Sequence, residues 1–155
     1  MLIRSMLAAL GTVAALGGAS AQAPASDPAL GTLLGTLPRD YAHASGRSAS
    51  QVYVAGDSIT EALLRQAGIA FEEPTKRLIC PASTDKKGQT PGKVGYHVRI
   101  TVAGTGDART VVMRKGCGFV YHGSEPRLFY EDWTFEVKRE GGAWRITRAE
   151  QTGIT

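Results

Sequence analysis

Apolar and polar residues alternate along much of the C-terminal half of the chain, as they do in a strand with one buried face. Between Val94 and Val102 every second residue is apolar, while His97 and Arg99 fall on the polar face. The segment Gly104–Asp107 then predicts a turn into a second strand. We therefore expect an antiparallel strand pair that begins near residue 94.

The alternation continues to the end of the chain. Residues 109–121 and 128–138 each place every second side chain on one face. The side chains that share these faces are Val111, Met113, Cys117, Phe119 and Tyr121 in the first run, and Phe129, Glu131, Trp133, Phe135 and Val137 in the second. Gly141-Gly142 predicts a tight hairpin turn, after which Trp144 and Ile146 carry a further strand with core-facing aromatic and aliphatic side chains.

Two earlier segments have helical spacing. Asp27-Pro28 is typical of an N-cap followed by the first helical residue, and leucines recur on one face from Leu30 to Leu37 until Pro38 ends the pattern.

In the second helical segment, Ser58 and Glu61 have the spacing of a capping box. Ile59, Leu63 and Gln66 share its expected buried face with Ala62, and Gly68 is a plausible C-terminal stop.

These elements predict an α+β fold with N-terminal helices packed on a curved antiparallel sheet of about four strands. A chain of 155 residues has room for one domain. We assign residues 22–50 to a leader with a short amphipathic helix and a loop, and residues 51–155 to the domain. Residues 51–55 form a brief apolar run, which is either a strand or an extended lead-in.

The first 21 residues predict an export signal. Arg4 precedes an apolar run, and Ala19-Ser20-Ala21 is a small-residue cleavage site before Gln22. The apolar run is too short for a lasting membrane span. We therefore expect a periplasmic or secreted protein with no stable membrane span after signal cleavage; an uncleaved N-terminal anchor is the alternative.

Export changes the interpretation of the two cysteines. Cys80 and Cys117 are an even pair, which predicts a disulfide in an oxidising compartment, with two buried thiols as the alternative. Two cysteines and three separated histidines are too few for a metal site, so we expect neither a metal nor a cofactor.

The charge balance is mildly basic. The chain has 18 Lys and Arg residues against 14 Asp and Glu residues, scattered along the sequence, which argues against a nucleic-acid partner. Lys86, Lys87 and Lys93 lie in or beside the long loop 81–93 and, with Arg77, are candidates for an anion-binding patch. Solvation of a loop that we expect to be mobile is the favoured interpretation of these cations.

The segment Val52–Thr60, which contains Gly56-Asp57-Ser58, resembles the first block of GDSL, or SGNH, hydrolases. That resemblance implies that Ser58 is a nucleophile at a strand-to-helix junction. The family also needs an Asn in its oxyanion hole and a downstream Asp-x-x-His block. This chain has no Asn, and its Asp40–His43 block lies upstream of the serine. We therefore favour a helix-capping role for Ser58.

The segment from Trp133 to Ile146, with its Gly-Gly turn, resembles the closing hairpin of nuclear-transport-factor-2-like domains, which are cystatin-like α+β folds. The resemblance implies helices in the concavity of a curved sheet, with a conical pocket or a protein-docking surface. Glu131 would then be an acid or base among aromatic residues. We favour instead an ion pair between Glu131 and an arginine such as Arg99 or Arg114.

Four functions remain open at this point. The favoured one is an exported, non-catalytic domain that binds a small molecule or an extracytoplasmic protein. The alternatives are a small isomerase or dehydratase that uses Glu131, an inhibitor of an extracytoplasmic hydrolase, and a hydrolase that uses Ser58.

Overall fold

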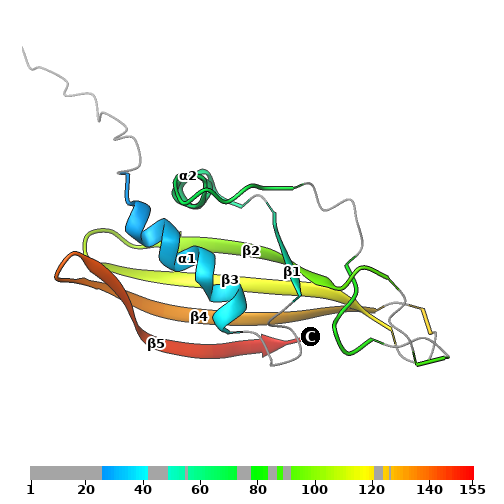
Figure 1. Cartoon of the computed structure of the whole chain (residues 1–155). Coiled ribbons are helices and arrows are strands. Elements are labelled where there is room, and N and C mark those ends of the chain that lie inside the picture. The colour runs from blue at the N-terminus through cyan, green and yellow to red at the C-terminus, as the bar shows by residue number, and fades with distance from the viewer. Residues whose placement is uncertain are drawn as a thin grey trace, which may run out of the picture.

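A computed structural model describes residues 26–41, 49–54, 56–72, 78–83, 87–88, 92–120, 124–125 and 127–155. The predicted signal peptide 1–21 and residues 84–86 and 89–91 of loop 81–93 lie outside the described residues. No helix in the described part of the chain is long and apolar enough to cross a membrane. The described elements form an α+β structure in which two helices lie beside one sheet (Figure 1).

The sheet has five strands, in the order β1-β2-β3-β4-β5. Their bounds are β1 Ser50–Tyr53, β2 Gly95–Ala103, β3 Ala108–Phe119, β4 Arg127–Glu140 and β5 Ala143–Ile154. Strands β2 to β5 form the predicted antiparallel meander, and both glycines of the β4–β5 turn have positive φ angles, as the tight hairpin requires.

The expectation of about four antiparallel strands was wrong in one respect, because β1 adds a fifth strand parallel to β2. Ser50 pairs with Gly95 and Tyr53 with Val98. Parallel neighbours need a long crossover connection. The chain between β1 and β2 supplies that length and carries the second helix.

Helix α1 spans Pro28–Asp40 and begins at its predicted N-cap. The Asp27 carboxylate accepts a hydrogen bond from the Leu30 amide at 3.0 Å and another from the Trp144 indole at 2.9 Å, which ties the helix start to β5. The helix continues through Pro38, where it was expected to end. The Tyr41 amide still donates to the Leu37 carbonyl, so the last turn closes around the proline.

Helix α2 spans Ser58–Gln66, but its N-cap is Asp57 and not Ser58, which corrects the predicted capping box. The Asp57 carboxylate accepts from the Thr60 amide at 2.8 Å, and the Glu61 carboxylate reaches back to the Gly56 amide at 3.1 Å. Aspartate outcompetes serine here because its charge also interacts favourably with the helix dipole.

The core lies between the helices and one face of the sheet, as predicted. Leu34 and Leu37 of α1 pack in one apolar cluster with Val98, Val111 and Phe135 of the sheet. Cys80 and Cys117 form the predicted disulfide inside this cluster. The bond fastens the segment Leu78–Cys80 to β3, where the Cys80 amide donates to the Gly118 carbonyl and the Gly118 amide donates to the Leu78 carbonyl.

Tyr53 links β1 to α1 and makes the fold sensitive to high pH. Its hydroxyl donates to the Gly35 carbonyl at 2.9 Å, and burial raises the pKa of Tyr53 to about 12. The tyrosine pKa in the unfolded chain is 10.0. The folded-state pKa is higher than the unfolded-state pKa. The contribution of neutral Tyr53 to stability is therefore complete below the unfolded-state pKa and is lost as the pH rises through the folded-state pKa.

We therefore expect tyrosinate absorbance in the folded protein to keep rising at high pH, accompanied by loss of circular dichroism, with Tyr53 and Tyr96 both contributing to this late rise. In Tyr53→Phe the amplitude of the late rise should fall by the contribution of one tyrosine. A late rise of unchanged amplitude in the variant would contradict the assignment to Tyr53.

Candidate functional site

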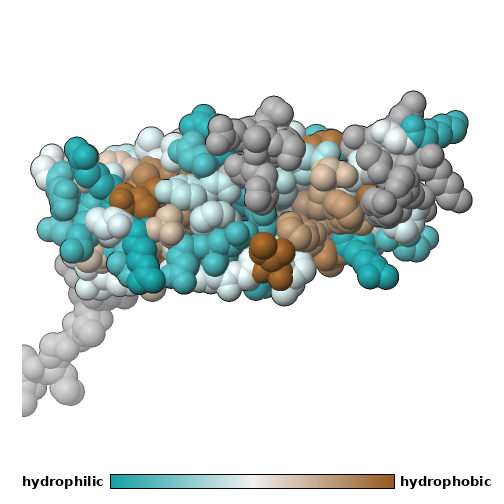
Figure 2. Space-filling view, turned by 90° about the horizontal axis from the view of Figure 1, so that it is seen from below, coloured by the Kyte–Doolittle hydropathy of each residue, from teal (hydrophilic) through white to brown (hydrophobic). Residues whose placement is uncertain are grey.

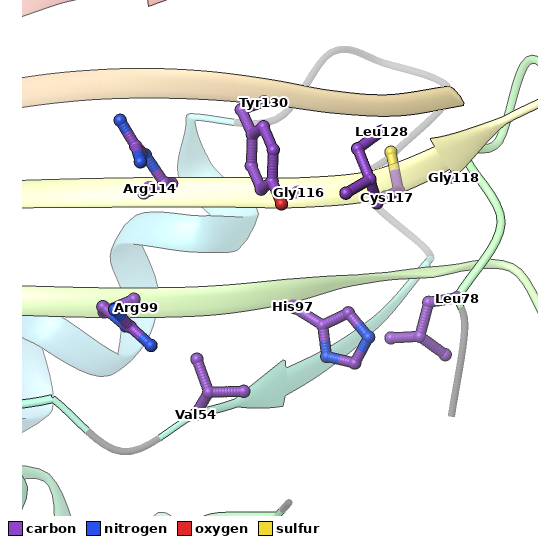
Figure 3. A pocket seen from close by; sticks show the side chains of 10 residues that line it. All are labelled: Val54, Leu78, His97, Arg99, Arg114, Gly116, Cys117, Gly118, Leu128 and Tyr130. Carbon is purple, nitrogen blue, oxygen red and sulfur yellow. The ribbon is translucent and has the colours of Figure 1, made fainter. Parts of the chain in front are cut away.

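The face of the sheet opposite α1 carries a groove with a volume of about 490 Å³. In Figure 3 the helix lies behind the strands, and the side chains that line the groove stand in front of them. Its polar lining comes from His97, Arg99, Arg114 and Tyr130. We call this cavity the outer-face groove.

Two glycines of β3, Gly116 and Gly118, lie along the floor of the groove. In the strand register, Gly116 lies between His97 of β2 and Tyr130 of β4. A Cβ atom at Gly116 would collide with the Tyr130 ring, so the ring lies directly over the glycine. Glycine inside a strand is typical of places where another group must approach the backbone closely.

One end of the groove is apolar. Leu128 is 60% exposed, and Leu78 is buried at the groove wall. Figure 3 shows Leu128 and Leu78 at the same end as Gly118, whereas Val54 lies beside Arg99 at the other end. An apolar ligand group would cover Leu128, whose exposed surface is otherwise in contact with water.

The other end is cationic. Arg99 of β2 is directly opposite Arg114 of β3, which is in turn opposite Asp132 of β4. Arg114 makes a bidentate ion pair with Asp132, with Nε–Oδ1 at 2.7 Å and Nη2–Oδ2 at 2.8 Å, and its guanidinium lies over the Tyr130 ring. The hydrogen bonds from Arg114 hold the pKa of the Asp132 carboxyl below its usual value.

Arg99 differs from Arg114 in its partners. In the part of the chain that the structure describes, Arg99 makes no ion pair, and its side chain is exposed. Figure 3 shows its guanidinium directed away from Arg114. Like charges directly opposite each other destabilise a sheet. The arrangement therefore leaves one positive charge at the groove that no described carboxylate balances.

Glu131 forms the predicted ion pair, but the expected partner was wrong. Its carboxylate is 3.0 Å from the Lys115 ammonium, and the side chains are 3% and 0% exposed. Arg99 and Arg114 lie on the opposite face of the sheet, because side chains alternate along a strand. Lys115 also donates to the Tyr41 carbonyl at 2.9 Å and lies over the Tyr96 ring.

The surroundings of Glu131 are packed. Neither the outer-face groove nor a second, smaller cavity near Gly104 is lined by Glu131. Burial, followed by the negative charge of Glu131, raises the pKa of Tyr96. These observations describe a buried ionic contact beneath α1 and give no support to the acid–base role of Glu131.

Ser58 is the exposed first residue of α2 and does not line the outer-face groove. Of the Asp-x-x-His block, Asp40 ends α1, and His43 lies outside the described residues. A neighbouring hydroxyl, that of Thr60, has a structural role instead. It donates to Asp57 and accepts from the Val102 amide, which connects α2 to β2.

The structure describes only part of the predicted anion-binding patch. Lys87 and Lys93 are exposed, whereas Lys86 and Arg77 lie outside the described residues. Within the described ranges, no group of His, Cys, Asp and Glu side chains could hold a metal ion. Among the described exposed cations, Arg99 and Arg114 line the outer-face groove, whereas Lys138 lines the smaller cavity near Gly104.

Comparisons with protein-family models, with curated proteins and with solved structures found no match for this chain. The resemblance to nuclear-transport-factor-2-like domains therefore stays a prediction.

Sequence reasoning placed His97 and Arg99 on the polar face but did not identify the groove. A usable signal was present in β3, where Gly116 and Gly118 occupy the outward positions of a strand. Tyr130 and Leu128 are recognisable as their neighbours only once the register of β3 against β4 is known.

Proposed function

We propose that this protein is an exported, non-catalytic binding domain whose ligand site is the outer-face groove. The observation that carries the proposal is the groove itself, with a volume of about 490 Å³ over two strand glycines and with both apolar and cationic lining. Ligand sites commonly have this size and combine an apolar lining with a few polar groups. The Cys80–Cys117 disulfide supports export, because such bonds persist in oxidising compartments.

The surface seen from the β5 side and the helix-covered face of the sheet offer less to a ligand. Figure 2 shows the molecule from the β5 side, where hydrophobic residues form separate patches in a mostly hydrophilic surface. Scattered apolar side chains of this kind are normal on a folded protein. The helix-covered face of the sheet is filled by core residues such as Leu34, Val98 and Phe135.

Nile red, a neutral and fluorescent apolar dye, is a suitable probe for the groove. We expect it to bind the protein with increased fluorescence, and Leu128→Asp to weaken this binding roughly tenfold, because the change places a charge where the dye would rest. Leu128 is 60% exposed, so the variant should fold normally.

Ile59→Asp is the matched control. Ile59 is 52% exposed and lies on α2, outside the groove, and an acidic residue is compatible with the first turn of a helix. This variant should bind Nile red like the wild type. Equal losses in both variants, or no binding to the wild type, would contradict the proposal.

A further inference from the structure

The cationic end of the outer-face groove indicates the chemical class of its ligand. Arg99 and Arg114 are directly opposite in the register of β2 and β3, and Asp132 neutralises one of these charges. Arg99, Arg114 and Asp132 together therefore carry a net charge of one positive unit. A ligand group with one negative charge balances this row, whereas a doubly charged group would leave excess negative charge beside Asp132.

The hydrogen-bond donors favour a planar anion. Arg114 uses its Nε and Nη2 groups on Asp132, while the Arg99 guanidinium makes no ion pair with the described residues. A guanidinium binds a carboxylate through two parallel hydrogen bonds, which fixes the orientation of the ligand as well as adding affinity. Arg99 is therefore the group available for a bidentate contact.

The opposite end of the groove determines the rest of the ligand. Leu128 supplies exposed apolar surface there, and the buried Leu78 and the glycine Gly118 lie at the same end. An alkyl or aryl chain that extends from the arginine end would cover this surface. The geometry favours a ligand with an acidic head and a hydrophobic tail over a compact, fully hydrated anion.

We infer that the outer-face groove binds a small carboxylic acid with an apolar tail, whose carboxylate is held by Arg99. This inference rests on the proposed function, because it assigns a ligand class to the same groove. Arg99 is then a ligand-binding residue. A bound carboxylate would also offset the repulsion between the positive charges of Arg99 and Arg114.

The test is displacement of Nile red by phenylbutyrate and by phenylbutanol, which have the same tail and differ in the acidic head. We expect the wild type to prefer the acid about tenfold, and inorganic phosphate not to displace the dye. In Arg99→Gln the preference for the acid should fall to within about twofold, with the affinity for the alcohol unchanged.

Arg145→Gln is the matched control, because Arg145 is exposed on β5 near the Gly141–Gly142 turn and away from the groove. This variant removes the same charge and should keep the preference for the acid. If Nile red binds but the acid and the alcohol compete equally, the inference fails and the proposed function stands. If Nile red does not bind the wild type, both fail. If phosphate displaces the dye better than phenylbutyrate does, the ligand is not a carboxylic acid with an apolar tail, and the inference fails.

Discussion

Replacing Glu131 with leucine is expected to destabilise the protein by about 3–5 kcal/mol, because it leaves the Lys115 ammonium buried without its carboxylate. Lys115 has no exposed side-chain surface, so water cannot solvate the charge in its place. Lys115→Met should be similarly costly, since it removes the ammonium that lies 3.0 Å from Glu131. Equilibrium unfolding in urea, followed by circular dichroism, measures both losses.

The double variant Lys115→Met with Glu131→Leu separates the ion pair from simple packing. A buried pair replaced by apolar side chains of similar size is often neutral in stability, so the double variant should be much closer to the wild type than either single variant. Some loss should remain, because the Tyr41 carbonyl loses its hydrogen bond from Lys115. Additive losses in the double variant would show that the two charges are not coupled.

The Arg114–Asp132 pair is a matched control on the other face of the same two strands. Its bidentate geometry is good, but the Arg114 side chain is 58% exposed, so solvent screens the charges. Arg114→Met with Asp132→Leu should therefore show a much weaker coupling than the buried pair. Equal coupling on both faces would contradict the burial that we describe for Lys115 and Glu131.

The second large effect is expected from the disulfide. Replacing Cys80 and Cys117 with alanine should destabilise the protein by about 4 kcal/mol in the chain-entropy model, because the bond joins residues 37 apart in sequence. For a domain of this size the melting temperature should fall by about 15 °C. The bond also holds Leu78 at the groove wall, so binding of Nile red should weaken in the same variant.

Reduction provides the control for this prediction. A reducing agent should lower the melting temperature of the wild type toward that of the double-alanine variant and should leave the variant itself unchanged. The role of the bond would be contradicted if the melting temperature of the wild type did not change after the disulfide had been reduced. It would also be contradicted if the double-alanine variant were as stable as the wild type.

The meander was predictable because each of its strands has one buried face. The period of two placed Val98, Val111 and Phe135 on the core side without knowledge of any neighbour. The fifth strand was harder to predict, since Ser50–Tyr53 is too short to show a period and its parallel pairing depends on a distant segment. Short edge strands of this kind are determined by tertiary contacts more than by local sequence.

The helices show where local rules compete. Asp57 and Ser58 are both good N-caps, and the choice of Asp57 moved the helix start by one residue. The buried face of α2 contains Thr60, Leu63 and Leu64, while Ile59 is 52% exposed. The sequence pattern had favoured Ile59 because it is apolar, whereas the structure buries Thr60, whose hydroxyl accepts a hydrogen bond from the Val102 amide.

The ion pair of Lys115 shows why the partner of a buried charge is hard to predict from sequence. The alternation in β3 already placed it between Met113 and Cys117 on the buried face. A charged residue at such a position is a signal for a buried partner, and Glu131 is directly opposite in the register. An arginine partner was predicted because the register of β3 against β4 cannot be obtained from either strand alone.

The groove combines residues from β2, β3 and β4 with two connecting segments, so no single stretch of sequence contains it. The most direct test of the site is nuclear magnetic resonance of the labelled protein during titration with phenylbutanol and with phenylbutyrate. Ligand contact in the groove predicts that the amide signals of Gly116, Gly118 and Tyr130 shift with both compounds, and those of Leu30 and Leu34 in α1 do not. Shifts that concentrate on α1, or none at saturating ligand, would contradict a binding site on the outer face of the sheet.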